Sequence, residues 1–428
     1  MQQAMSTATI VVITALLSVF ASVLGMNLVA AAGRRLRRRP RHLYALQEAD
    51  FRRVMGVLLG PAILGGNEVR PLVNGDRIFP PMLAAIQGAR HSICLETFIY
   101  WSGAIAEQFS AALEAAAARG VRVHVIFDWL GTRGRPPKLL TQLRGAGVEV
   151  VVHHALSWVH MGRLNNRTHR KLLLVDGALG FTGGVGIAPQ WEGDAEDPAH
   201  WRDTHYEVRG PVVAQMQAVF LDNWIKATGE VLHGPAYFPP LEAAGDMDAQ
   251  MFGSSPAGGA DNMQLMFMLA LAAARHSIDI TSSYFVPDRM AVNALVAAAR
   301  RGVSVRVLVP GRYCDVPLVQ RASRACWGRL LKAGVALYAY EGTMMHAKLV
   351  VIDGVWMTLG SANFDNRSFH LNDEANLNVF SARLAGQEAR QFETDLARSR
   401  RIHWEGWHRR PLVQRVLDSL ARMLHAQL

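Results

Sequence analysis

Cysteine is scarce, with three residues in a chain of 428: Cys94, Cys314 and Cys326. Their number and spacing fit neither a zinc site nor a disulfide framework, and they agree with a reducing compartment. The sequence also lacks an H-E-x-x-H motif and a P-loop, so nothing in it indicates a metal-dependent hydrolase or nucleotide hydrolysis. We therefore expect neither a metal nor a cofactor.

Acidic residues are fewer than basic ones, 35 against 45, which gives a formal net charge of +10 and a pI of about 9.9. A basic surface suits anionic partners such as acidic lipid headgroups or nucleic acid, and composition does not choose between them. Because half of the chain is hydrophobic, we expect a globular protein with a large core rather than a disordered one.

Charge is absent from residues 8–32, a run of 25 residues, whereas about 20 apolar residues suffice to span a bilayer as a helix. Six arginines follow this run: Arg34, Arg35, Arg37, Arg38, Arg39 and Arg41. The positive-inside rule then predicts a single-pass anchor with the rest of the chain in the cytoplasm. A cleaved signal peptide is the alternative, since 30–32 is a small-residue site, but its positive charge should precede the apolar run.

One motif of the form H-x-K-x4-D occurs twice. Its residues are His169, Lys171 and Asp176 in the first copy and His346, Lys348 and Asp353 in the second. The apolar run after each histidine predicts a buried strand, and the Asp-Gly pair that ends it predicts a turn. We count both aspartates with the catalytic motif and interpret their part in it as that of structural turn residues. Alternate side chains of a strand share a face. Two such strands would place two histidines and two lysines in one cleft, where they could process a phosphodiester.

The duplication extends along most of the chain. Residues 89–93 recur at 274–278, residues 119–123 recur in part at 301–305, and the motif histidines are 177 residues apart (346−169). In both copies strands alternate with helices, which predicts an α/β fold with a mostly parallel mixed sheet flanked by helices. The expected elements are strands 92–98 and 277–283, helices 104–118 and 289–300, and strands 121–127 and 303–309.

The predicted domain boundaries follow from these patterns. The anchor and its basic flank cover 1–42, the first half 43–240 with a helical lead-in over 43–90, a linker loop 241–262, the second half 263–400 and an amphipathic tail 401–428. In that tail, one helical face carries Val413, Val416, Leu417, Leu420 and Leu424. Such a face either packs against the rest of the protein or rests on a membrane.

The duplicated motif resembles that of the phospholipase D superfamily. The stretch 360–369 followed by Asn372 and Glu374 is similar to the second half of bacterial cardiolipin synthases, and 284–287 and 201–205 are similar as well. The resemblance covers about residues 65–400. It implies two halves packed about a pseudo-two-fold axis, with one histidine as nucleophile and the other as proton shuttle.

The resemblance also assigns supporting roles. Lys171, Lys348 and Asn363 would bind the phosphate, although Gly186 occupies the position in the first half that matches Asn363. Asp203 and Glu374 would hold the catalytic histidines in one tautomer. Weaker candidates for supporting the site are Glu96, Ser361 and Ser368.

The resulting hypothesis is a cardiolipin synthase of the bacterial inner membrane that joins two phosphatidylglycerol molecules through a phosphohistidine and releases glycerol. Its expected partners are phosphatidylglycerol and anionic membrane lipids, without nucleic acid, and its oligomeric state stays open. The alternatives are a phospholipase D or transphosphatidylase that uses another acceptor, and a phosphodiesterase that acts on nucleic acid. The sequence leaves open the acceptor, the leaflet and which histidine is the nucleophile.

Overall fold

The structure is a computed structural model that describes residues 38–41, 44–153, 166–256 and 262–423, together with Thr14, Ser18 and Ser22. The predicted anchor, 8–32, lies outside the described residues except for these three positions. None of the helices in the described ranges has the length and apolar character needed to cross a bilayer.

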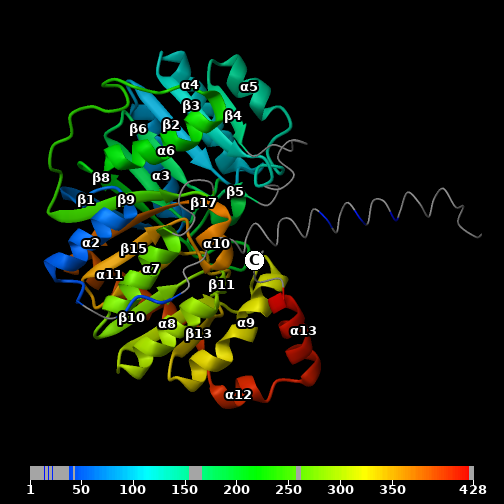
Figure 1. Cartoon of the computed structure of the whole chain (residues 1–428). Coiled ribbons are helices and arrows are strands. Elements are labelled where there is room, and N and C mark those ends of the chain that lie inside the picture. The colour runs from blue at the N-terminus through cyan, green and yellow to red at the C-terminus, as the bar shows by residue number, and fades with distance from the viewer. Residues whose placement is uncertain are drawn as a thin grey trace, which may run out of the picture.

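In the described residues, sixteen strands form one continuous sheet whose order is nearly symmetrical about its centre (Figure 1). The order is β18-β13-β12-β10-β14-β15-β17-β9-β1-β8-β7-β6-β2-β3-β4, and β5 pairs with β17. The strands up to β8 are β1 Leu64–Val73, β2 Ser92–Thr97, β3 Arg122–Asp128, β4 Glu149–His153, β5 Arg167–Thr168, β6 Leu172–Val175, β7 Leu179–Gly183 and β8 Thr204–Arg209.

The second half repeats this arrangement on the other side of β9. Its strands are β9 Met247–Ser254, β10 Ser277–Thr281, β12 Ser304–Pro310, β13 Ala336–Tyr340, β14 Leu349–Ile352, β15 Trp356–Gly360, β17 Asn372–Phe380 and β18 Ser399–Ile402. A separate small sheet joins β11 Phe285–Val286 to β16 Phe364–Asp365. The two halves therefore share one sheet, with β17, β9 and β1 at the middle.

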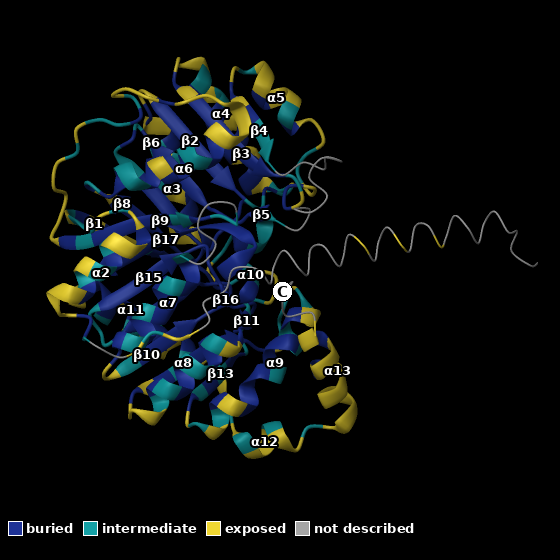
Figure 2. Ribbon diagram, viewed as in Figure 1, coloured by how far each residue is buried: buried dark blue, intermediate teal, exposed yellow. Residues whose placement is uncertain are grey.

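Helices cover both faces of this sheet, and the strands between them are almost wholly buried (Figure 2). The helices are α2 Ala49–Leu59, α3 Gly75–Gly88, α4 Ala104–Ala118, α5 Leu139–Gly145, α6 Val213–Thr228, α7 Asn262–Ala273, α8 Arg289–Arg300, α9 Pro317–Lys332, α10 Asn366–His370, α11 Ala382–Ala397, α12 Trp404–His408 and α13 Leu412–Met423, with a 3-10 turn at Pro189–Trp191. The apolar core has one large cluster in each half and a third that includes residues of both halves.

Two helices have the bounds that the sequence predicts: α4 and α8. Helix α8 begins at a good cap, because the Asp288 carboxylate accepts the backbone N–H of Ala291 at 2.7 Å. Strands β2, β3, β10 and β12 lie within one to two residues of the predicted positions. Strong periodicity and local caps were sufficient signals in these elements.

The sheet is mixed and flanked by helices, as predicted, but the prediction that it is mostly parallel was wrong. Only β2-β3-β4 and β10-β12-β13 run parallel within the halves, whereas the motif strands β6 and β14 and the strands that follow them are antiparallel. The reason is the Asp-Gly turn after each motif strand, where Asp176 and Asp353 both have φ of 53°. Short turns of this kind return the chain as a hairpin and cannot make a parallel crossover.

Two segments predicted as helical lead-in and as linker loop contain central strands instead. β1 pairs with β8 along Glu68–Val73, and β9 joins β1 to β17. Pro71 weakened the strand signal in β1, yet β9 pairs with β1 only near Leu64 and Asn67, so Pro71 needs no donor on that side. The predicted linker is thus the strand that connects the halves.

Candidate active site

Each motif histidine is attached through its backbone to the opposite half of the chain. The N–H of His169 donates to the carbonyl of Asp373 at 2.9 Å, just after β5 pairs with the start of β17. The N–H of His346 donates to the carbonyl of Arg202 at 2.7 Å. These two bonds place both motifs at the seam between the halves.

The side chains of the histidines cross the same seam. Nδ1 of His169 lies 3.0 Å from Oε2 of Glu374, which comes from the second half. Nδ1 of His346 lies 2.7 Å from Oδ2 of Asp203, which comes from the first half. Each carboxylate therefore fixes the tautomer of the histidine from the other half and leaves that ring's Nε2 for chemistry.

Further donors hold these two buried carboxylates in place. Asp203 accepts the indole N–H of Trp191 at 2.9 Å and the backbone N–H of Thr204 at 2.8 Å. Glu374 accepts the hydroxyl of Ser361 and, at 3.2 Å, the amide of Asn372. Carboxylates that accept several hydrogen bonds stay ionised even when they are buried.

The two lysines lie beside the histidines, each directly before its motif strand, β6 or β14. The ammonium of Lys171 donates to the carbonyl of His169 at 2.8 Å. The ammonium of Lys348 donates to the hydroxyl of Ser283 at 2.6 Å and lies 3.3 Å from Nε2 of His346. Both lysines are more than 95% buried, so their donors are preorganised for a phosphate group in a site with little water.

Burial governs the protonation of this cluster. Burial, with Lys171 reinforcing it and Glu374 opposing it, lowers the pKa of His169 to about 4, and burial and Lys348 likewise lower the pKa of His346. Although burial raises it, the adjacent His169 brings the pKa of Glu374 down to about 2. The resting site thus contains neutral imidazoles beside ionised carboxylates, and a neutral imidazole is a nucleophile.

The lysine pKa values are also depressed. Burial together with Lys348 lowers the pKa of Lys171 to about 7, and burial lowers the pKa of Lys348 to about 8. The charge of Lys348 disfavours the charged form of Lys171, and the carboxylates of Glu374 and Asp203 only partly offset this. A phosphodiester would relieve this repulsion, which is a reason to bind one.

Comparison with known proteins agrees with this geometry. The family model described as "Cardiolipin synthase, PLD-like domain" matches residues 82–224 and 268–396. A cardiolipin synthase of Geobacillus kaustophilus is 34% identical over 82% of this chain and 71% of its own length, and cardiolipin synthase 1 of Bacillus cereus is 32% identical over the same shares. The chain belongs to the cardiolipin synthase family of phospholipase D-like enzymes.

Solved structures show how widely this fold occurs. A phosphatidylserine synthase from Haemophilus influenzae superposes with a TM-score of 0.66 at 13% identity, covering 88% of this chain and 98% of that one. A polyphosphate kinase from Porphyromonas gingivalis gives a TM-score of 0.53 at 14% identity, over 79% of this chain and 49% of that one. These likenesses show the fold alone.

The position that we expect to bind phosphate differs between the two halves. Asn363 is buried, and its side-chain oxygen has no partner among the described residues. At Gly186, a Cβ atom would lie 2.8 Å from Ile99 and 3.0 Å from Trp191. The first half has therefore filled the space where a second amide would stand, and the site has one such amide.

The aspartates that end the motifs do not reach the site. Asp176 accepts the backbone N–H groups of Arg90, His91 and Ser92 at 2.7 to 3.2 Å, at the far end of β6 from His169. Asp353 accepts those of Arg275, His276 and Ser277 at 2.7 to 2.8 Å. The positions of Asp176 and Asp353 therefore do not support a catalytic role, although both belong to the motif. They stabilise the turns that end the motif strands.

Two of the weaker candidates form hydrogen bonds with other residues of the site, and the third supports the backbone next to it. Ser361 bonds Glu374, and Ser368 accepts the backbone N–H of Asn363 at 3.0 Å. Glu96 is fully buried, bonds the hydroxyl of Thr168, and accepts the amide of Asn223 at 2.7 Å. It supports the backbone next to His169 without contacting the imidazole.

Sequence reasoning missed two residues that the site uses. Trp191 is 1% exposed, and it donates to Asp203 and packs on His346 with ring centroids 5.2 Å apart. Nothing in the neighbouring sequence marks Ser283 as a site residue, yet its hydroxyl accepts a hydrogen bond from Lys348. Ser283 lies two residues after β10, and in the repeat it corresponds to Phe98, whose ring packs beside His169. This correspondence is the one feature of the repeat that could have identified it.

Among the residues that the structure describes, one group has the composition of a metal site: Glu196, Asp197 and His200. They lie on a surface turn, and the His200 ring bonds Asp197 at 2.9 Å. An exposed cluster satisfied by its own ion pair needs no metal to explain it.

Proposed function

We propose that this protein is a cardiolipin synthase that transfers a phosphatidyl group from one phosphatidylglycerol to another. The carrying observation is the pair of buried histidines, each oriented by a carboxylate from the opposite half, with a lysine beside each. Membership of the family and the cardiolipin synthase names of the relatives support the same assignment.

In the first step, Nε2 of one histidine attacks the phosphorus of phosphatidylglycerol. The bond from phosphorus to the headgroup glycerol oxygen breaks, and the second imidazole, which must enter this step protonated, gives its proton to that oxygen. Glycerol leaves and a phosphatidyl-histidine remains. Glu374 or Asp203 stabilises the positive charge that develops on the attacking imidazole.

In the second step, the now neutral imidazole removes a proton from the glycerol hydroxyl of a second phosphatidylglycerol. That oxygen attacks phosphorus, the phosphorus–nitrogen bond breaks, and cardiolipin forms. Lys171, Lys348 and Asn363 bind the non-bridging oxygens in both steps. General acid–base catalysis of this kind contributes roughly 10²–10⁴-fold.

The acceptor must compete with water at about 55 M, which requires that the lipid alcohol be held in place, and well-oriented groups reach effective molarities of about 10⁵ M or more. A membrane supplies acceptor lipid continuously, and the net charge of +10 favours anionic phosphatidylglycerol at its surface. We propose that residues 8–32 form a single-pass anchor that keeps the catalytic part on the cytoplasmic face.

Purified full-length protein given phosphatidylglycerol alone, without metal or nucleotide, should produce cardiolipin and glycerol in equal amounts. Lipid mass spectrometry with a glycerol assay would measure both products. Phosphatidic acid as the main product would move the function to a hydrolytic phospholipase D. A requirement for a cytidine-activated lipid would contradict the mechanism.

A further inference from the structure

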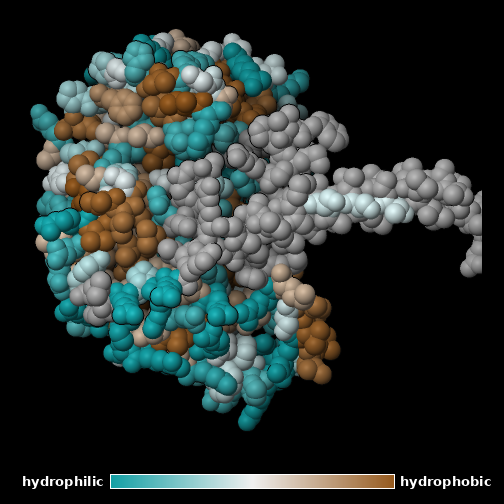
Figure 3. Space-filling view, viewed as in Figure 1, coloured by the Kyte–Doolittle hydropathy of each residue, from teal (hydrophilic) through white to brown (hydrophobic). Residues whose placement is uncertain are grey.

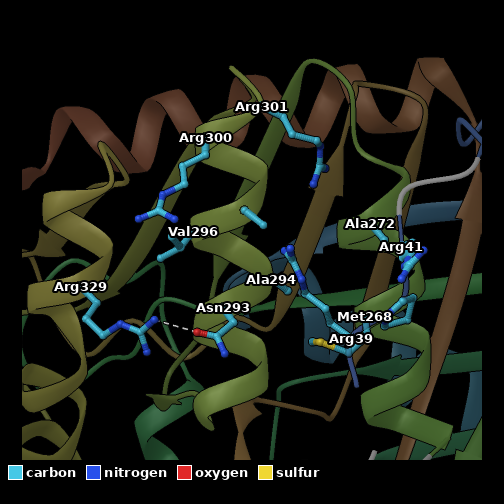
Figure 4. Close-up of a pocket in the computed structure, with 12 residues that line it drawn as sticks. Arg39, Arg41, Met268, Ala272, Asn293, Ala294, Val296, Arg300, Arg301 and Arg329 are labelled. Atoms are coloured by element: carbon cyan, nitrogen blue, oxygen red, sulfur yellow. Dashed lines mark hydrogen bonds between the residues drawn. The ribbon is translucent and has the colours of Figure 1, made fainter. Parts of the chain in front are cut away.

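A pocket of about 530 Å³ lies outside the active site, on the helical layer of the second half. Its floor is apolar, with Met268 and Ala272 from α7 and Val296 from α8, and arginines surround it (Figure 4). The arginines are Arg39, Arg41, Arg300, Arg301 and Arg329. The volume falls within the range of about 300–1,000 Å³ usual for small-molecule sites.

The arginines converge without acidic partners. None of the residues that line the pocket is acidic, and Arg39, Arg41 and Arg300 have no side-chain hydrogen-bond or ion-pair partner within the described part of the chain. Arg301 donates to the carbonyls of Leu271 and Ala274, and burial, with Arg39 adding to it, lowers its pKa. Cations gathered in this way repel one another until an anion joins them.

We propose that this pocket binds the phosphate headgroup of an anionic phospholipid. Guanidinium groups recognise phosphate with paired donors, and the apolar floor suits the glycerol backbone and first acyl carbons. Arg39 and Arg41 follow the predicted anchor directly, which places them where a lipid of the inner leaflet is within reach. The pocket is a second lipid site, separate from catalysis.

The test compares two charge-reversal variants of the full chain in a non-ionic detergent. Arg41→Glu with Arg300→Glu alters the pocket, and Arg77→Glu with Arg390→Glu is the control, because those side chains are exposed, lie on α3 and α11, and give the same change of net charge. Native mass spectrometry counts the short-chain phosphatidylglycerol molecules bound to each chain. Inorganic phosphate and a short-chain choline lipid are titrated in parallel.

We expect the unaltered chain and the control to bind one phosphatidylglycerol more than the pocket variant does, with the affinity for that additional lipid weakened at least tenfold in the pocket variant. The same number of bound lipids on the pocket variant and on the control would overturn the proposal. Equal occupancy by inorganic phosphate at the same concentration would show a site for a free anion instead of a lipid, and would overturn it as well. Neither result depends on turnover at the histidines.

Helix α13 presents a different surface, since it turns its large apolar side chains away from the protein. They are 40–74% exposed: Leu412, Val413, Val416, Leu417, Leu420 and Met423. Figure 3 shows them gathered as one brown patch over α13. The predicted stripe is therefore present over the described residues, and it does not pack against the catalytic domain.

The polar face of α13 is the face that packs. Asp418 is 1% exposed and pairs with Arg324 at 3.3 Å and Arg410 at 3.5 Å. Residues two apart on a helix are about 200° apart, so Val416 and Leu420 point away from Asp418. Leaving either arginine or Asp418 without its partner would be unfavourable, so the ion pairs fix the rotation of the helix.

This helix is continuous with a wall of the active site. Ala421 packs in a cluster with Val286 of β11 and with Val319 and Ala322 of α9. Ser283, which bonds Lys348, precedes β11 by two residues. Arg409, Arg415 and Arg422 are exposed beside the stripe. An apolar stripe flanked by arginines and attached to a lipid-processing site fits the surface of an anionic bilayer.

We propose that α13 lies in the interface of the bilayer and seats the second half against it; this rests on the proposed lipid substrate. In a Cys314→Ser background, an environment-sensitive dye is attached at Leu420→Cys or, as control, at Gln414→Cys, because Cys94 and Cys326 are buried. The full chain is reconstituted in vesicles of phosphatidylglycerol and phosphatidylcholine. Spin-labelled lipid should quench the dye at 420 several-fold more than at 414.

A functional test compares two double variants. One carries Leu417→Glu and Leu420→Glu on α13, and the other carries Val57→Glu and Leu58→Glu on α2, where the replaced side chains are also exposed. The α13 pair should lower turnover on vesicles about tenfold and leave turnover in detergent unchanged. Equal quenching at the two dye positions would overturn the proposal. So would dye self-quenching that rises with protein density, since it would assign the stripe to a second copy.

Discussion

The two halves have the same backbone arrangement, but the side chains that support the two catalytic histidines differ. In the second half, Ser361 follows the turning glycine and its hydroxyl bonds Glu374. In the first half, the matching residue is Gly184, where a Cβ would lie 2.4 Å from Asp203. The shorter carboxylate and the indole of Trp191 thus replace the pairing of a longer carboxylate with a serine. The duplicated halves therefore share one topology, and each supports a histidine with different side chains.

The largest expected effect comes from removing either histidine. His169→Ala and His346→Ala should each lower turnover by at least about 10³-fold, because nucleophile and proton shuttle serve one reaction. The roles of the two histidines can be told apart if the reaction is quenched in base and the phosphorylated peptide is identified by mass spectrometry. A lipid phosphate on one histidine alone would assign the roles, whereas substantial turnover in either variant would refute the two-histidine mechanism.

The carboxylates come next. Asp203→Asn and Glu374→Gln should each reduce kcat by roughly 10²–10⁴-fold, because an amide can present its donor to Nδ1 and favour the wrong tautomer. Circular dichroism should show intact folds. If Asp203 serves His346 across the seam, its effect should be nearly absent in a His346→Ala background, and additive losses would contradict the crossed pairing.

The amide asymmetry offers a third test. Asn363→Ala should lower kcat/KM by roughly 10–10²-fold, the loss of one donor to charged oxygens. Gly186→Asn should not restore symmetry. Its Cβ would press on Ile99, and overpacking of this kind destabilises by about 1–3 kcal/mol. Thermal unfolding and steady-state kinetics would measure both, and a more active Gly186→Asn enzyme would show that the space is open.

The lysines should set the alkaline limit. Because the pKa of Lys171 is about 7 and that of Lys348 about 8, the lysines are charged below these values and lose charge as pH rises through them. We expect kcat/KM, which reports the free enzyme, to fall above about pH 7. Lys171→Arg should move that fall upward by about one pH unit or more, since guanidinium stays charged. If the alkaline fall of kcat/KM stays at the same pH in Lys171→Arg, Lys171 is not the group that causes it.

The smallest effect concerns acid stability. Burial lowers the pKa of His205 to about 4, so the unfolded chain, with an ordinary value near 6.5, binds a proton more readily. This group's contribution to stability is complete above about pH 6.5 and is lost as pH falls toward 4. The matching residue in the second half is Asn376. His205→Asn should therefore reduce the difference in unfolding free energy between pH 7 and pH 4.5 by up to roughly 3 kcal/mol. Urea unfolding at both pH values would show it.

The residues named from the sequence fall into two groups for physical reasons. His169, Lys171, His346 and Lys348 lie in the residues that lead into the short apolar strands β6 and β14, and the two-residue spacing of each pair predicts a shared face. Asp203 and Glu374 were expected to orient the histidines, and each lies within hydrogen-bond distance of an imidazole Nδ1. Their partners could not be assigned, because a contact between residues 143 and 205 positions apart depends on how the halves associate.

Local signals fixed the duplicated motif, the helices α4 and α8, the turn aspartates and the apolar stripe of α13, because periodicity, caps and turn residues act within a few positions. Tertiary structure alone decided that β9 is a central strand, that each carboxylate serves the opposite histidine, and that Asp418 turns the stripe of α13 outward. These outcomes arise from burial and pairing between distant segments, which become energetically defined only once the sheet has assembled.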